Sequence, residues 1–164
     1  MMELSGGCYC KTVTFSVMSH APYPYMRCYC SFCCQTSGSG GFGINIIANA
    51  DSLSVSGEEH IGFHHGMEHD EESDELRQSE GGRYFCGECG SPLWAADLRW
   101  SQWIYPYASA VLTPLPVPPE SVHIMLDFKA PWIDVPAGPG HKCFQRYPDE
   151  SIVDWHIRHG LYIE

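Results

Sequence analysis

Four cysteines crowd into one short stretch, RCYCSFCCQTSG, which covers residues 27–38. They are Cys28, Cys30, Cys33 and Cys34. A cysteine can form a disulfide, pack as a small apolar group, ligate a metal as thiolate, or act as a nucleophile. The stretch alone is compatible with each of these roles, so the other cysteines of the chain must decide among them.

Two further cysteine pairs lie outside this cluster: Cys8 and Cys10 in GGCYCK, and Cys86 and Cys89 in RYFCGECGS. The second is a Cys-x-x-Cys knuckle followed by glycine, a turn that points two sulfurs at one ion. Structural zinc takes four thiolates in a tetrahedron, so the knuckle needs a second pair, either Cys8 and Cys10 or two members of the 28–34 cluster. The two outlying pairs make one complete set, and we expect them to form a closed zinc site that staples the sheets together.

Cys28, Cys30 and Cys33 then remain as a Cys-x-Cys-x-x-Cys chelate. Three protein ligands leave one coordination position open, which distinguishes catalytic from structural zinc. The alternative is a closed site completed by Cys34, a histidine or an aspartate, although adjacent cysteines cannot easily point at one ion. Three thiolates make zinc a weaker Lewis acid than three histidines do, so the site suits a soft sulfur substrate. We expect a small thiol such as glutathione to bind there and to attack, or be released from, an electrophilic carbon such as that of an aldehyde.

The composition favours metal sites over disulfides. Nine cysteines is an odd number, which a fully disulfide-paired monomer cannot accommodate. The N-terminal MMELSGG lacks the basic start and apolar stretch of a secretory signal, so we expect a cytoplasmic protein with reduced thiols. The formal net charge is −11 and no run of Lys or Arg occurs, which disfavours nucleic acid and anionic membranes as partners. No apolar run approaches the roughly 18–20 residues of a membrane span, and a homo-oligomer is compatible with the sequence.

A length of 164 residues fits one domain with a single core. Short alternating or β-branched segments, separated by Gly, Pro and Ser, predict a mainly β fold with one or two short helices. These segments are 11–17, 42–48, 52–56, 83–85, 91–96, 103–110 and 122–126. A helix is predicted in DESIVDWHIRHG (149–160), where Ser151 and Asp154 resemble a capping box.

Two segments interrupt the predicted strands. The proline-rich TPLPVPPE (113–120) is expected to be an extended surface loop. The segment 58–75 is acidic and carries four histidines, and we expect a solvated insertion there. Its His65 and His69 could hold a metal if the stretch were helical, but its glycines and acidic run argue against a helix.

Several other residues carry a weaker signal. Arg27, beside the cluster, could bind a substrate carboxylate. Cys34 and Cys143 are expected to be buried packing residues, although Cys143 could also be a distant ligand or nucleophile. The histidines of the predicted strand and helix are expected to be satisfied by neighbours rather than catalytic: His123, His156 and His159.

Four blocks, GGCYC…VTFSV, CYCSFCCQTSG, YFCGECGSPLW and VHIMLDFKAPW, resemble the family of glutathione-dependent formaldehyde-activating enzymes, to which centromere protein V belongs. The resemblance runs from about Gly6 to Trp132. It implies an all-β, zinc-bearing fold called the β-tent, and its type member is a carbon–sulfur lyase that joins glutathione to formaldehyde. The resemblance also implies the ligands of the two zinc ions. They are Cys8, Cys10, Cys86 and Cys89 for the structural ion, and Cys28, Cys30 and Cys33 for the catalytic one.

The chain departs from this family in places. Lys11 stands where glycine is common, and Tyr29 where histidine is common. The acidic insertion and the C-terminal stretch are not family hallmarks. The KAPW block resembles a family motif, so Lys129 and Trp132 are candidates for lining the pocket or meeting an anionic substrate. The alternative is that Trp132 belongs to the core and Lys129 is a surface charge.

The sequence therefore predicts a zinc-dependent carbon–sulfur lyase that acts on the adduct of a small thiol with an aldehyde or other electrophile. It would hold two zinc ions and use glutathione as co-substrate. Two alternatives stay open. One is a non-catalytic zinc module that binds a protein partner through the proline-rich loop and the acidic insertion. The other is a zinc enzyme on the same scaffold whose small-molecule substrate is not glutathione.

Overall fold

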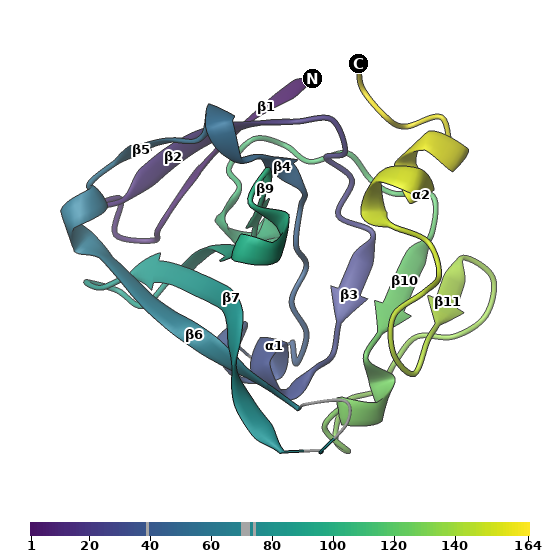
Figure 1. Cartoon of the computed structure of the whole chain (residues 1–164). Coiled ribbons are helices and arrows are strands. Elements are labelled where there is room, and N and C mark those ends of the chain that lie inside the picture. Colours follow the sequence, from purple (N-terminus) through teal and green to yellow (C-terminus); the bar gives the residue numbers. More distant parts are fainter. Residues whose placement is uncertain (39, 70–72, 74) are drawn as a thin grey trace.

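The computed structural model describes residues 1–38, 40–69, 73 and 75–164. Short strands dominate this part of the chain, and it holds two short α-helices (Figure 1). The strands are β1 (Met2–Gly7), β2 (Thr14–Ser19), β3 (Met26–Cys28), β4 (Ala48–Asn49), β5 (Ser54–Ser56), β6 (Ile61–His69), β7 (Leu76–Cys86), β8 (Pro92–Asp97), β9 (Trp103–Pro106), β10 (Ser121–Ile124) and β11 (His141–Cys143). The helices are α1 (Ser31–Thr36) and α2 (Ile152–Arg158). The predicted mainly β fold is confirmed, and no helix of the described residues is long and apolar enough to cross a membrane.

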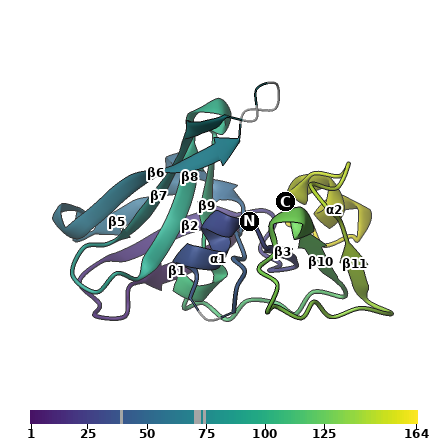
Figure 2. The same cartoon turned by 90° about the horizontal axis from the view of Figure 1, so that it is seen from below.

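The strands divide into three sheets. The largest has the order β4-β9-β8-β7-β6, the second β1-β2-β5 and the third β11-β10-β3. Figure 2 shows α1 between the first two of these sheets and the part formed by β3, β10, β11 and α2. Helix α1 therefore lies where the two halves of the molecule meet.

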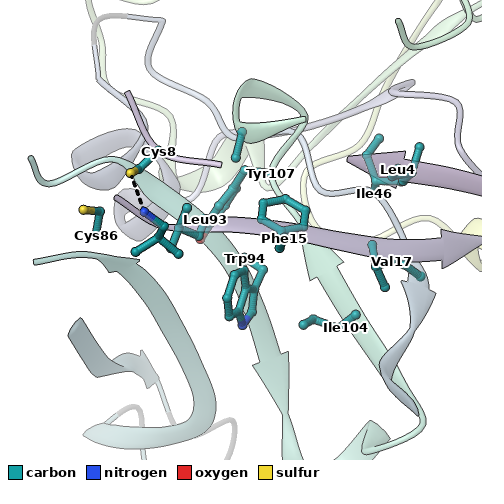
Figure 3. Packing of buried hydrophobic residues seen from close by; sticks show 13 residues of the cluster. Leu4, Cys8, Phe15, Val17, Ile46, Cys86, Leu93, Trp94, Ile104 and Tyr107 are labelled. Carbon is teal, nitrogen blue, oxygen red and sulfur yellow. Dashed lines mark hydrogen bonds between the residues drawn. The ribbon is translucent and has the colours of Figure 1, made fainter. Parts of the chain in front are cut away.

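The five-stranded sheet and the β1-β2-β5 sheet are antiparallel and enclose the main core (Figure 3). Val13, Phe15 and Val17 are buried, as the alternation of 11–17 predicts. The ring of Phe15 meets that of Trp94 on β8 edge-on, with ring centres 5.4 Å apart. Burial of each large apolar side chain contributes about 1.5–3 kcal/mol, so this contact fixes one sheet against the other.

The third sheet is parallel in both of its pairings. Its middle strand β10 joins β3, far back in the sequence, to β11 near the C-terminus. Helix α2 covers it, and the ring of Trp155 stacks on that of Tyr25 with centres 3.7 Å apart. This packing holds β3, which ends at Cys28, in a fixed place.

Helix α2 lies within the range predicted from the sequence. The hydroxyl of Ser151 accepts the backbone N–H of Asp154 at 3.1 Å, as the capping pattern predicts. His156 is fully buried, accepts the N–H of Tyr23 at 3.1 Å and donates to the carbonyl of Ile152 at 2.7 Å. Both ring nitrogens are used, so His156 is a satisfied structural residue, as expected.

The other two histidines singled out from the sequence are also held by neighbours. The ring nitrogens of buried His123 lie 3.0 Å from the Tyr29 hydroxyl and 3.0 Å from the ring of His141. His159 contacts the carbonyl of Trp155 at 2.8 Å. Their structural interpretation is confirmed.

The two segments expected to interrupt the strands behave differently. The loop 113–120 contains no helix or strand, and Val117 is 88% exposed, as predicted. The expectation that 58–75 interrupts the strands is wrong for Ile61–His69, which forms the edge strand β6 and pairs with β7, although most described side chains there are exposed, as expected. An edge strand with exposed polar side chains has a composition similar to that of a loop, so the sequence pattern did not indicate this strand. Residues four apart in a strand are separated by about 13 Å, so the helical spacing of the His65 and His69 pair is absent; the side chain of His69 lies outside the described residues.

Candidate metal centres

Cys8, Cys10, Cys86 and Cys89 come together from two distant turns. Cys8 and Cys10 follow β1, Cys86 ends β7, and Cys89 lies in the turn before β8. Their four Sγ atoms all lie within 4.8 Å of one another. Thiolates at about 2.3 Å from zinc in a tetrahedron lie about 3.8 Å apart, so this spacing fits one ion.

Hydrogen-bond donors point at these sulfurs. The backbone N–H of Val13 donates to Cys8 Sγ at 3.2 Å. The Sγ of Cys89 lies 3.2 Å from the Ser91 hydroxyl, and this hydrogen bond lowers the pKa of Cys89 to about 6. Burial raises the pKa of Cys86 to about 11. Donors to sulfur favour thiolate, and thiolate is the form that zinc binds, so the donor set suits a zinc ion.

Each ligand pair is followed by a left-handed turn residue. Lys11 has φ 64° and donates its N–H to the Cys8 carbonyl at 3.1 Å. Gly90 has φ 73° and donates to the Cys86 carbonyl at 2.8 Å. A left-handed conformation costs a residue with a Cβ about 1–2 kcal/mol. Glycine is common at this position in the family that the sequence resembles, and the left-handed conformation explains that preference.

Cys28, Cys30 and Cys33 form a second group. Cys28 ends β3, Cys30 is the N-cap of α1, and Cys33 lies in the first turn of that helix. Their Sγ atoms lie within 4.8 Å of one another. Hydrogen bonds from Cys28 and Cys33 lower the pKa of Cys30 to about 3, while the same contacts raise the pKa of Cys28. The group therefore readily holds a thiolate at Cys30.

In the described chain, no fourth Cys, His, Asp or Glu joins these three sulfurs. Cys34 is partly exposed, donates its N–H to the Cys30 carbonyl at 2.9 Å, and lies outside the group. Gly43 covers one side, because its backbone exchanges two hydrogen bonds with Cys28 at 2.9 and 3.0 Å. A Cβ at Gly43 would lie 3.3 Å from Cys33 Sγ, so a larger residue would crowd the site. The arrangement fits three ligands and an open position.

Arg83 of β7 lies over the helix that carries these cysteines, and sequence reasoning missed it. Its guanidinium lies 4.7 Å from the ring centre of Phe32, which stands between Cys30 and Cys33 in α1. Beyond the hydrogen bonds from Cys28 and Cys33, the positive charge of Arg83 also lowers the pKa of Cys30. No local motif links Arg83 to the cluster, because only the sheet brings the two together.

Two tyrosines that were not predicted have pKa values to which the negative charge of these cysteines contributes. Tyr107, just after β9, is 2% exposed, and burial together with the negative charge of the cysteines raises its pKa. Tyr147 is 69% exposed, and the Met125 N–H holds its segment through the carbonyl of Arg146 at 3.2 Å. Surrounding protein and the negative charge of the same cysteines raise the pKa of Tyr147 to about 12. Because most of Tyr147 is exposed, it lies at the surface rather than in the core.

The three binding residues predicted from the sequence lie in different surroundings. The guanidinium of Arg27 lies 5.2 Å from the ring centre of Phe42, and alternation along the strand places Arg27 on the opposite face from Cys28. Lys129 donates to the carbonyls of Ala130 at 3.2 Å and Ile133 at 2.6 Å.

Trp132 is 65% exposed, so its alternative assignment to the core is wrong. A Cβ at Gly41 would lie 3.3 Å from Trp132, which places the indole beside the segment that leads to Gly43. Trp132 is thus an exposed aromatic close to the segment that covers the three sulfurs.

All nine cysteines are free thiols. Cys143 is exposed, so the expectation that it packs in the interior is wrong. It lies in β11, an edge strand of the parallel sheet, where one flank meets solvent. Cys143 belongs to neither sulfur group.

Comparisons with known proteins show the family of the chain. The sequence model described as glutathione-dependent formaldehyde-activating enzyme matches residues 3–113. A protein of Halomonas elongata is 46% identical over 160 residues, covering 98% of each chain, and carries the provisional name of glutathione-dependent formaldehyde-activating enzyme. The crystal structure of a Rhodobacter sphaeroides protein is similar in fold, with a TM-score of 0.51 and 20% identity, over 70% of this chain and 92% of that one.

Proposed function

The chain belongs to the family of glutathione-dependent formaldehyde-activating enzymes and is an enzyme, and we propose that it is a zinc-dependent carbon–sulfur lyase. The proposed substrate is the adduct of a small thiol, glutathione or a close relative, with formaldehyde or another aldehyde. The observation that carries the proposal is the group of Cys28, Cys30 and Cys33, to which the described residues add no fourth Cys, His, Asp or Glu. A closed four-cysteine set stands apart from it and serves structure.

The two cysteine groups have different roles in this proposal. Cys8, Cys10, Cys86 and Cys89 would hold a structural zinc that joins the turn after β1 to the turn between β7 and β8. Cys28, Cys30 and Cys33 would hold the catalytic zinc, whose positive charge, when it is bound, favours the thiolate form of a substrate sulfur. The cysteines themselves keep one side of the site free for that sulfur.

Trp132 is the proposed contact for the rest of the thiol substrate. Its indole is largely exposed and lies beside Gly41, on the chain that continues to the sulfurs. We propose that Lys129 supports this contact by tying the 129–133 segment through its two carbonyl hydrogen bonds. Arg27 is the weakest of the three candidates, because strand alternation turns it away from Cys28.

The nine free thiols fit a reducing compartment, and we propose the cytoplasm. The proposed partners are small molecules, a thiol and an aldehyde. Trp132, the proposed contact for the thiol, lies beyond the 3–113 match to the family, so the identity of the thiol is the part of the proposal that is tested directly.

The test measures zinc per chain and the zinc-edge X-ray absorption of the protein, purified under reducing conditions, with and without glutathione. Cys28→Ser serves as the site variant, and Cys143→Ser as the matched control on an exposed cysteine outside both groups. We expect about two zinc ions per chain, one of which gains a sulfur neighbour with glutathione. In Cys28→Ser we expect the loss of one ion and of adduct formation from glutathione and formaldehyde.

An unchanged sulfur shell in the presence of glutathione would contradict glutathione as the substrate and favour another small molecule. One zinc ion per chain in the unmodified protein would contradict the catalytic site itself. Equal zinc content and equal turnover in Cys28→Ser and Cys143→Ser would contradict the assignment of Cys28 as a ligand of the catalytic zinc.

A further inference from the structure

Buried polar atoms without hydrogen-bond partners occur on segments that lie next to the three-cysteine group. Among the described residues, the buried side-chain atoms in this condition are Ser37 Oγ, Asn45 Oδ1, Arg83 Nε and Tyr107 OH. A Cβ at Gly43 would meet both Ser37 Oγ and Cys33 Sγ, at 3.0 and 3.3 Å, and Asn45 forms a backbone bridge with Tyr107. A buried polar atom left unpaired destabilises a fold, so unpaired atoms on these neighbouring segments are candidates for pairing with a ligand.

Arg83 brings a positive charge with free hydrogen-bonding capacity to this place. Its guanidinium stacks over Phe32 at 4.7 Å, its Nε has no partner among the described residues, and Nη1 makes only a long contact of 3.5 Å with the Gly82 carbonyl. None of the ion pairs seen in the described chain includes Arg83. The stacking holds the guanidinium plane in position while its N–H groups stay available.

Tyr107 brings a neutral donor to the same place. Its backbone is fixed by the N–H hydrogen bond to the Leu93 carbonyl at 3.0 Å, and its ring lies within the core cluster (Figure 3). Only the hydroxyl lacks a partner in the part of the chain that the structure describes. Tyr107 forms a backbone bridge with Asn45, which lies two residues after Gly43, and Gly43 exchanges two hydrogen bonds with Cys28, so Tyr107 and the sulfurs lie on neighbouring segments. Burial raises the pKa of Tyr107, which keeps its proton on oxygen as a donor requires.

We propose that Arg83 and Tyr107 are the donor pair for the substrate oxygen, the atom that carries negative charge when the thiol sulfur bonds to the aldehyde carbon. This inference rests on the proposed carbon–sulfur lyase activity. In the forming direction the S–C bond is made, the π electron pair of C=O moves to oxygen, and the proton that the thiol gave up ends on that oxygen. In the reverse direction the hydroxyl loses this proton, C=O is restored and the S–C bond breaks. The N–H of Arg83 and the O–H of Tyr107 hydrogen-bond to the oxygen in both directions, and removal of one such donor lowers kcat by about 10²–10³-fold in other enzymes.

The test uses zinc-loaded wild type, Tyr107→Phe, Arg83→Gln and Arg83→Lys, with Tyr105→Phe as the matched tyrosine control on β9. Binding is measured by calorimetry with S-(2-hydroxyethyl)glutathione and its isostere without the hydroxyl, S-propylglutathione. We expect wild type and Tyr105→Phe to bind the hydroxyl conjugate with about tenfold higher affinity than S-propylglutathione, which corresponds to the contribution of a good hydrogen bond. Tyr107→Phe and Arg83→Gln should lose this preference while the affinity for S-propylglutathione and the zinc content stay unchanged. Arg83→Lys, which keeps the charge and loses the planar donor set, should retain part of the preference.

A stability measurement separates this role from a structural one. Because Tyr107→Phe removes an unpaired buried hydroxyl, we expect its unfolding temperature to rise by about 2–4 °C while kcat falls. If wild type shows no preference for the hydroxyl conjugate, or if the variants match Tyr105→Phe in preference and kcat, this inference is overturned and the proposed function stands. If wild type binds neither glutathione nor its conjugates and forms no adduct, the proposed function falls, and the inference falls with it.

Discussion

The backbone N–H of Cys33 donates to the Sγ of Cys30 at 3.3 Å, so one sulfur both begins helix α1 and belongs to the three-cysteine group. An oxygen of Ser, Thr, Asp or Asn usually fills this capping position. Here a proposed metal ligand takes that place, so the start of the helix and the geometry of the group depend on the same side chain.

Cys30→Ser should therefore separate capping from metal binding. Serine is a strong N-cap, so α1 should persist, while the loss of a thiolate should remove the zinc from this group. We expect zinc content to fall by about one ion per chain and adduct formation to fall by at least about 100-fold. Elemental analysis and a glutathione–formaldehyde assay measure the two effects.

Cys34→Ser is the matched control for this variant, because Cys34 lies in the same helix but outside the sulfur group. It should keep its zinc and its activity. A Cys30→Ser protein with full zinc content and full activity would show that Cys30 is a capping residue only.

Cys86→Ser should act on stability, because Cys86 is fully buried and its sulfur group joins two distant turns. Loss of a structural zinc leaves those turns without their link, and we expect a destabilisation of about 3 kcal/mol or more. For a chain of this size this corresponds to a fall of roughly 6–12 °C in unfolding temperature. Thermal unfolding with Cys143→Ser as the control measures it, and equal unfolding temperatures would contradict a structural metal.

The cysteine groups were predictable from the sequence because cysteines that can ligate one metal ion follow short, regular spacings. The knuckle at Cys86 and Cys89, and the chelate at Cys28, Cys30 and Cys33, are read directly along the chain. The structure brings together the same two sets, one of four cysteines and one of three, that counting zinc ligands along the sequence predicts. Strand 11–17 and helix α2 were predictable for a similar reason, because their signals are local alternation and a cap.

The residues around the three-cysteine group were not predictable in this way. Arg83 and Tyr107 reach the group only through the pairing of β7, β8 and β9, which is a long-range property. In the sequence, the Tyr-Pro-Tyr block at 105–107 indicates no more than an edge strand or a bulge. The parallel pairing of β3 with β10 is also long-range. The position of Tyr147 is long-range too, because the N–H of Met125, just after β10, holds the neighbouring carbonyl of Arg146.

Acid should destabilise the protein through His123. Burial, and then the positive charge of Arg27, lower the pKa of His123 to about 4, while an unfolded histidine titrates near 6.5. The unfolded state therefore binds the proton more readily, so stability is retained above about pH 6.5 and lost as the pH falls toward about 4. The total loss is about 3 kcal/mol. Denaturant unfolding of wild type and His123→Gln at several pH values measures it, and equal pH slopes of the two proteins would contradict this role, since acid loss of zinc is common to both.

Lys11→Gly should stabilise the protein, because Lys11 holds φ 64° without the freedom of glycine. Relief of this conformation is worth about 1 kcal/mol, or roughly 2–4 °C in unfolding temperature. Gly90→Ala is the matched reverse change, since Gly90 has φ 73° and a Cβ there would meet no atom of the described chain within 4 Å. Any loss in Gly90→Ala therefore reflects the backbone conformation alone, and we expect it to be of similar size. Thermal unfolding of both variants at equal zinc content gives the comparison, and a Lys11→Gly protein less stable than wild type would mean that the lysine side chain makes a stabilising contact of its own.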